Sequence, residues 1–166
     1  MDKVLISACL LGRPVRYDGR DKRLSHPLLE RWRREGRLVP VCPEVMAGFP
    51  TPRPPAEIAP GGDGAAVLEG TAGVFEAGGR EVSDQFRAGA RRALATARAE
   101  GCRYALLTDG SPSCGARFIS GGAFDGTRVD GQGVVTALLE AEGIRVFPET
   151  EIDRLAALLD RGEVRT

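Results

Sequence analysis

Four cysteines, Cys9, Cys42, Cys102 and Cys114, are the residues of this chain best suited to chemistry. No two of them have the spacing of a CxxC pair, which is the pattern of dithiol redox sites. Thiolates are soft ligands that select zinc or iron–sulfur clusters. Each cysteine taken alone could instead be a small buried hydrophobic residue. Whether they form a site therefore depends on where the fold places them.

The predicted strands indicate which cysteines can meet. Cys9 and Cys42 directly follow the first two buried strands, and Cys114 lies in the loop after the third. Sites in open α/β sheets lie beyond the carboxyl ends of the strands, so we expect these three thiols to converge. Cys102 precedes the third strand. A strand of this kind spans roughly 17–20 Å, which places Cys102 at the opposite edge of the sheet, as a buried residue.

Apolar, β-branched strands alternate with helices along the chain. The core strands are predicted over 3–8, 38–41, 104–107 and 144–147. Four helices are predicted. The first runs from a cap at Ser25 to Gly36, the second spans 84–100 after a cap at Ser83, the third spans 133–142, and the last follows a cap at Thr150. Short strands over 67–69 and 73–76, with a turn into 80–82, predict a small β-hairpin insertion. Residues 124–129 fit a loop or short hairpin. The pattern predicts an α/β fold: one domain over 1–166, with a mainly parallel, Rossmann-like sheet flanked by helices.

Composition excludes several classes of function. The 166 residues are 42% hydrophobic and carry 23 basic and 23 acidic side chains. This balance argues against general binding to nucleic acid or to a membrane surface. No apolar run approaches the ~18 residues of a membrane span, and the first residues lack a signal-peptide pattern. We therefore expect a cytoplasmic protein, monomeric or a small homo-oligomer, whose partner is a small molecule.

The cysteines are compatible with two kinds of metal centre, a zinc site or an iron–sulfur cluster. A structural zinc site is normally closed by a fourth protein ligand, and His26, the single histidine, lies near the start of the first helix. A cubane cluster held by three thiolates would leave one iron open to a substrate atom. A non-catalytic iron–sulfur or zinc protein therefore remains an alternative to an enzyme.

Five segments occur in a fixed order and carry a family resemblance. They are Ser7-Ala8-Cys9-Leu10-Leu11-Gly12, Arg16-Tyr17-Asp18-Gly19, Cys42-Pro43-Glu44, Thr51-Pro52-Arg53-Pro54-Pro55-Ala56-Glu57 and Ser111-Pro112-Ser113-Cys114-Gly115. The set resembles the bacterial family first catalogued as a domain of unknown function, which includes the thiouracil desulfidases. The resemblance spans Val4 to Phe147.

The resemblance implies an oxygen-sensitive [4Fe–4S] cluster held by Cys9, Cys42 and Cys114, with catalytic roles for Glu44 and Ser111. The implied reaction converts a thiolated pyrimidine, such as thiouracil, to its oxo form and hydrogen sulfide without net electron transfer. The open iron would act as a Lewis acid on the carbon–sulfur bond. Glu44 would activate the attacking water, and Ser111 would donate to the ring or relay the proton. Another thiolated nucleobase or nucleoside is an alternative substrate.

Further residues are candidates for substrate binding. They are Arg16, Tyr17, Asp18, Arg53 and Ser113. The segment from Arg16 to Gly19 could equally form a plain turn. Arg53, between prolines, could contact a substrate carbonyl, an acidic neighbour or a surface carboxylate. Glu57 could anchor a loop or be a solvated charge.

The chain departs from the family pattern at two places. Many members have a cysteine where this chain has Val15, so this position should not be a ligand. Many also have a lysine or another basic residue where this chain has Thr108 and Asp109. If that residue helps to hold the substrate, specificity here would differ.

Overall fold

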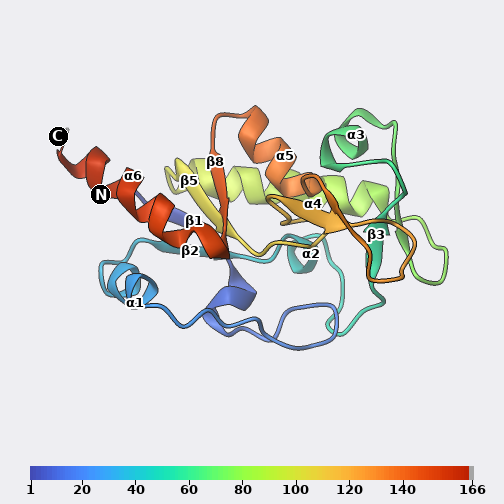
Figure 1. Ribbon diagram of the computed structural model, residues 1–166, viewed down its shortest axis with the longest axis horizontal. Coiled ribbons are helices and arrows are strands. Elements are labelled where there is room, and N and C mark those ends of the chain that lie inside the picture. The colour runs from blue at the N-terminus through green and yellow to red at the C-terminus, as the bar shows by residue number, and fades with distance from the viewer. Residues whose placement is uncertain (165–166) are drawn as a thin grey trace.

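The centre of the fold is a parallel sheet with the strand order β2-β1-β5-β8 (Figure 1). The computed structural model describes residues 1–164. The strands are β1 (Val4–Ser7), β2 (Leu38–Val41), β5 (Tyr104–Leu107) and β8 (Arg145–Pro148). All three strand pairs are parallel, so the four carboxyl ends lie at one edge. The predicted α/β class and parallel sheet are confirmed.

Helices cover both faces of this sheet (Figure 1). One face packs against α1 (Pro27–Arg34) and α6 (Ile152–Val164), and the other against α4 (Ser83–Ala99) and α5 (Val134–Ala141). The side chains of β1 alternate between these two faces. Val4 and Ile6 pack on the side of α1 and α6, and Leu5 packs on the side of α4 and α5. This alternation follows from the two-residue period of a strand. No helix within residues 1–164 is long and apolar enough to cross a membrane.

Small elements follow the ends of the core strands. A 3-10 turn over Ala8–Leu11 follows β1, α2 (Pro43–Met46) follows β2, and a second 3-10 turn over Glu149–Glu151 follows β8. Two antiparallel pairs lie outside the main sheet. They are β3 (Ala56–Ile58) with β4 (Val74–Glu76), and β6 (Phe118–Ser120) with β7 (Arg128–Asp130). The segment 124–129 is predicted to be a loop or short hairpin. It forms part of the connection between β6 and β7 and the start of β7, so the prediction of a short hairpin is confirmed.

The predicted strand over 67–69 is wrong, because these residues end α3 (Gly64–Glu69). A short apolar run does not by itself distinguish a strand from a buried helical turn. The Asp63 carboxylate accepts from Ala66 N at 2.9 Å and caps the helix, and Gly70 ends it with φ +84°. The predicted pairing of 73–76 with 80–82 is reduced to the bridge Phe75–Glu81. The full partner of β4 is β3.

Three predicted helix caps are wrong by one or two residues. His26, not Ser25, caps α1, because its Nδ1 accepts from Leu28 N. Ser83 lies inside α4, and its hydroxyl accepts from Val74 N. Thr150 lies within the 3-10 turn that precedes α6. All three helices are present. Their exact first residues depend on local hydrogen bonds, which residue preferences for helix caps do not determine.

The short helix α2 lies against α4 at a glycine. A Cβ on Gly89 of α4 would lie 2.5 Å from the carbonyl oxygen of Pro43. The two backbones therefore approach more closely than any side chain would allow. Since Pro43 follows Cys42 directly, this contact fixes where the second predicted thiol lies.

We predict that Gly89→Ala lowers the free energy of unfolding by about 1–3 kcal/mol, because overpacking a backbone contact outweighs the gain in helix propensity. The matched control is Gly162→Ala in α6, where the added Cβ meets a flexible carboxylate oxygen of Asp2 at 3.2 Å. Denaturant unfolding of both variants tests this. Equal stability of the two variants would contradict the close-contact role of Gly89.

Candidate functional site

A cavity of about 320 Å³ opens at the carboxyl edge of the sheet. Its walls come from the segments that follow β1, β2 and β5, from β3, and from the hairpin of β6 and β7. Sites in parallel α/β sheets are expected at this edge. The candidate catalytic residues Glu44 and Ser111 both line the cavity.

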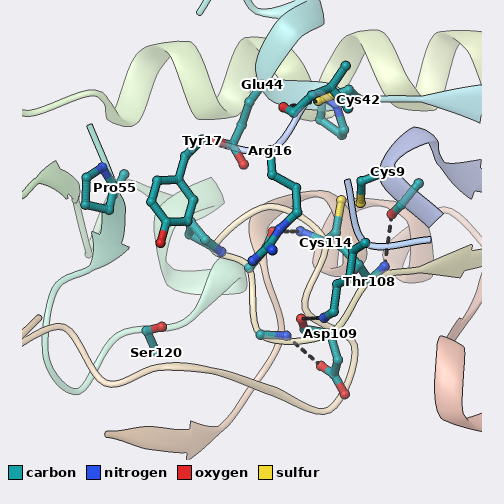
Figure 2. A pocket seen from close by; sticks show the side chains of 18 of the residues that line it. Cys9, Arg16, Tyr17, Cys42, Glu44, Pro55, Thr108, Asp109, Cys114 and Ser120 are labelled. Atoms are coloured by element: carbon teal, nitrogen blue, oxygen red, sulfur yellow. Dashed lines mark hydrogen bonds between the residues drawn. The ribbon is translucent and has the colours of Figure 1, made fainter. Parts of the chain in front are cut away.

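Three thiols line this cavity, from three separate segments (Figure 2). Cys9 lies in the 3-10 turn after β1, Cys42 is the residue before α2, and Cys114 lies in the loop after β5. All four cysteines are free of disulfides. Cys102 is buried just before β5 and does not line the cavity. The structure therefore groups the three cysteines that the strand ends single out.

The protein surroundings favour the neutral form of these thiols. Burial raises the pKa of Cys9 to about 11, while the positive charges of Arg16 and Lys22 oppose this shift. Burial likewise raises the pKa of Cys42 and of Cys114. A metal centre binds thiolates, so its binding would displace the protons of these three groups.

The three thiols line one cavity from different segments of the chain. Within residues 1–164, no three His, Cys, Asp or Glu side chains are arranged to hold a metal ion together. A closed zinc site needs four converging ligands. A group of several metal atoms takes its thiolates from different sides, and these three thiols reach one cavity from three segments.

Glu44 points into the cavity (Figure 2), and each of its carboxylate oxygens accepts a hydrogen bond. Arg53 Nε donates to Oε1 at 3.1 Å, and Ser113 Oγ donates to Oε2 at 3.2 Å. Glu44 is in the first turn of α2, two residues after Cys42. The carboxylate is therefore held in one orientation beside a thiol. The sequence names all three residues as candidates, but it does not predict that they bond one another.

The buried guanidinium of Arg53 connects three segments. Besides Glu44, it donates to the carbonyl oxygens of Pro50 at 3.2 Å and Val15 at 2.9 Å, and to Thr51 Oγ1 at 3.2 Å. Its side chain is 4% exposed. The structure shows the acidic neighbour expected for Arg53, and Arg53 also lines the cavity. Val15, the position where the resemblance leads us to expect no metal ligand, contributes its carbonyl oxygen.

The loop that carries Cys114 is capped by Ser111. Ser111 Oγ accepts from the backbone N–H of Ser113 at 3.0 Å and of Cys114 at 2.7 Å. Ser113 is buried and does not line the cavity; its hydroxyl faces Glu44. A hydroxyl that accepts two N–H groups still has its own proton to donate.

Asp109 organises the same loop, a role that the sequence analysis missed. Its Oδ1 accepts from four backbone N–H groups, those of Gly110, Ala116, Arg117 and Phe118, at 3.0–3.1 Å. An aspartate followed by glycine after a strand is a local signal for a turn, but the distant amides become visible only in the fold.

The segment after Gly12 supplies the rim of the cavity. Arg16 and Tyr17 line it, and Tyr17 is 41% exposed (Figure 2). Asp18 does not line it; its carboxylate accepts from Arg20 N at 3.0 Å in a turn. Lys22, which the sequence analysis did not single out, also lines the cavity.

The hairpin of β6 and β7 forms the far wall. Phe118, Ser120 and Arg128 line the cavity from it, and none of them was predicted, since nothing local marks a short hairpin as a cavity wall. Glu57 Oε1 accepts from Gly122 N at 2.8 Å. Glu57 is thus a loop anchor for this hairpin, one of the two readings that the sequence left open.

The fold and the cavity define a class: a parallel α/β protein with three thiols gathered at the carboxyl ends of its strands. The model of the 2-thiouracil desulfurase family matches residues 4–151, and the chain belongs to this family. The resemblance stated from the motifs is therefore confirmed, and with it the expectation of an enzyme that cleaves carbon–sulfur bonds.

Two known proteins are similar over nearly the whole chain. A Bacillus subtilis (strain 168) protein, "Uncharacterized protein YbbK", is 42% identical over 153 residues, which cover 90% of this chain and 97% of the relative. A solved structure of the [4Fe-4S]-dependent thiouracil desulfidase TudS is 44% identical, with a TM-score of 0.87. That match covers 96% of this chain and 99% of the TudS chain.

We predict that Arg53→Met destabilises the protein by about 3–5 kcal/mol, because it leaves the Glu44 carboxylate and three further acceptors without their buried cation. The matched control is Arg98→Met, which breaks the exposed pair of Arg98 with Glu142 and should cost at most about 1 kcal/mol. Thermal and denaturant unfolding measure both. Similar losses in the two variants would show that Arg53 is not a structural cation.

Proposed function

We propose that this chain removes sulfur from a thiolated pyrimidine, converting thiouracil to uracil and hydrogen sulfide without net electron transfer. The single observation that carries the proposal is the grouping of Cys9, Cys42 and Cys114 around one cavity that also contains Glu44. Family membership and the likeness to TudS support the same reaction.

Cys9, Cys42 and Cys114 would hold a [4Fe–4S] cluster. The fit rests on the chemistry of the donors. They are three free thiols, which are soft ligands, and all three line one cavity. When bound, a cluster with three protein ligands supplies one open iron, a Lewis acid that polarises a carbon–sulfur bond.

Glu44 would be the group that holds and moves the proton of the attacking water. Its carboxylate lies at the cavity two residues from Cys42. Arg53 and Ser113 occupy one lone pair on each oxygen, so the carboxylate is oriented and retains capacity to accept a proton. In this role Arg53 and Ser113 position the base, whereas the sequence analysis proposed that they contact the substrate.

Ser111 would donate from its hydroxyl to the substrate ring or relay the proton. The hydroxyl oxygen is fixed by two backbone N–H groups, so its remaining donor has a limited range of directions. Arg16 and Tyr17, at the rim, would contact the ring. Asp18 would act only through the turn that presents these two residues.

The cavity would accept a small molecule and neither a nucleic acid nor a membrane. Its volume of about 320 Å³ is in the range of small-ligand pockets. The equal numbers of basic and acidic residues give no electrostatic footprint for a polyanion. We propose a single-domain cytoplasmic enzyme, as a monomer or small homo-oligomer.

We predict that the protein, reconstituted without oxygen, contains about four irons per chain, and that Cys9→Ser, Cys42→Ser and Cys114→Ser each lose most of this iron because three thiolates hold the cluster. The matched control is Cys102→Ser, which should retain it. Iron and sulfide analysis and the visible spectrum provide the measurement. A single tightly bound zinc in place of iron would contradict the cluster and favour a structural metal protein.

We predict that Glu44→Gln keeps the iron content but lowers the rate of sulfide release from thiouracil by about 100-fold or more, the usual contribution of a general base. The matched control is Glu57→Gln, since Glu57 also lines the cavity and a glutamine oxygen can still accept from Gly122 N. A near wild-type rate for Glu44→Gln would show that another group handles the proton.

A further inference from the structure

Lys22 places a lysine ammonium at the cavity. It is one of two lysines in the chain, and it lies in the segment between the 3-10 turn after β1 and α1. Its backbone N–H donates to the carbonyl oxygen of Cys9 at 3.0 Å, and the residue lines the cavity. The other lysine, Lys3, pairs with Glu100 at the surface. The two lysines therefore offer a comparison between one cavity cation and one surface cation.

The Lys22 ammonium contacts two residues that follow other strands of the sheet, Asp109 after β5 and Glu149 after β8. Nζ donates to the carbonyl oxygen of Asp109 at 3.3 Å and lies 3.7 Å from Glu149 Oε1. The Glu149 carboxylate is 15% exposed and also accepts from Asp109 N. The ammonium is thus fixed at the edge where β1, β5 and β8 end, although it belongs to a long connecting segment.

The ammonium retains donor capacity toward the cavity. A lysine ammonium has three N–H donors. In the part of the chain that the structure describes, Asp109 and Glu149 are its two partners, which leaves one donor for a ligand. The Lys22 side chain is 39% exposed. The buried cation of the cavity, Arg53, is instead directed at Glu44 and at carbonyl oxygens of its own neighbourhood.

We propose that Lys22 is a substrate-binding residue, whose ammonium donates a hydrogen bond to the exocyclic oxygen of a thiolated pyrimidine. The inference rests on the proposed function and adds the substrate group that is recognised: an oxo group on the ring. A fixed ammonium is a compact positive charge, suited to a single oxygen atom. By holding the oxo group, it orients the ring and its thiocarbonyl group relative to the three thiols.

Equilibrium binding separates this role from a structural one. The parent is reconstituted protein carrying Glu44→Gln, so that turnover does not consume the ligand. The two probes are 2-thiouracil and 2-thiopyrimidine, which lacks the oxo group. Dissociation constants are measured by calorimetry without oxygen, and iron content is measured on every sample. Lys22→Met and Lys22→Arg are compared with the control Lys3→Met.

We expect Lys22→Met to weaken the binding of 2-thiouracil by about 10- to 100-fold, the effect of losing a hydrogen bond to a charged donor. Binding of 2-thiopyrimidine should change by less than about twofold, and iron content should not change. Lys22→Arg should recover part of the affinity, and Lys3→Met should match the parent.

Two results would overturn the inference. Equal weakening for both probes, or loss of iron in Lys22→Met, would show that Lys22 only supports the loop that carries Cys9. Unchanged binding of 2-thiouracil would show that Lys22 does not touch the ligand. Failure of the proposed function is distinguishable: the iron-loaded parent with Lys22 intact would not bind 2-thiouracil at all, which would exclude this substrate and the inference together.

Discussion

A single buried carboxylate oxygen shapes the loop on which the candidate site depends. Asp109 Oδ1 accepts four backbone N–H groups from the segment after β5, and hydrogen bonds to an ionised acceptor are stronger than those between neutral groups. The chain between Gly110 and Phe118 is thereby folded back on itself. Cys114 and Ser111 lie within this loop, so their positions depend on the hydrogen bonds between its backbone amides and Asp109.

The start of α5 supports the same loop from the other side. The first N–H groups of a helix have no partner within it. Here Val134 N donates to Pro112 O at 2.8 Å, and Val135 N donates to Ser113 O at 2.9 Å. A Cβ on Gly133 would lie 2.4 Å from Ser113 O, so only glycine permits this approach. The loop that carries the third thiol is therefore held by a carboxylate on one side and by a helix start on the other.

The sequence predicts those parts of the site that follow from strand geometry. Cys9, Cys42 and Cys114 could be grouped and Cys102 set apart, because parallel strands end at one edge and a strand's length separates its two ends. The pairing of Glu44 with Arg53 and Ser113 could not be predicted, since it joins segments nine and 69 positions apart. The helix over Gly64–Glu69 was missed for a related reason: its six residues do not establish a period.

The walls of the cavity have different structural origins. The three thiols and Glu44 follow strands of the main sheet or lie in the first turn after one, whereas Phe118, Ser120 and Arg128 belong to a separate two-stranded hairpin. The cavity-facing side chains of Ser120 and Arg128 can therefore change without altering a residue of a core strand. If the proposed centre acts as described, such an arrangement would let one set of thiols serve different molecules over the course of evolution. It also gives the protein engineer two positions, Ser120 and Arg128, to vary without replacing any of the three thiols or Glu44.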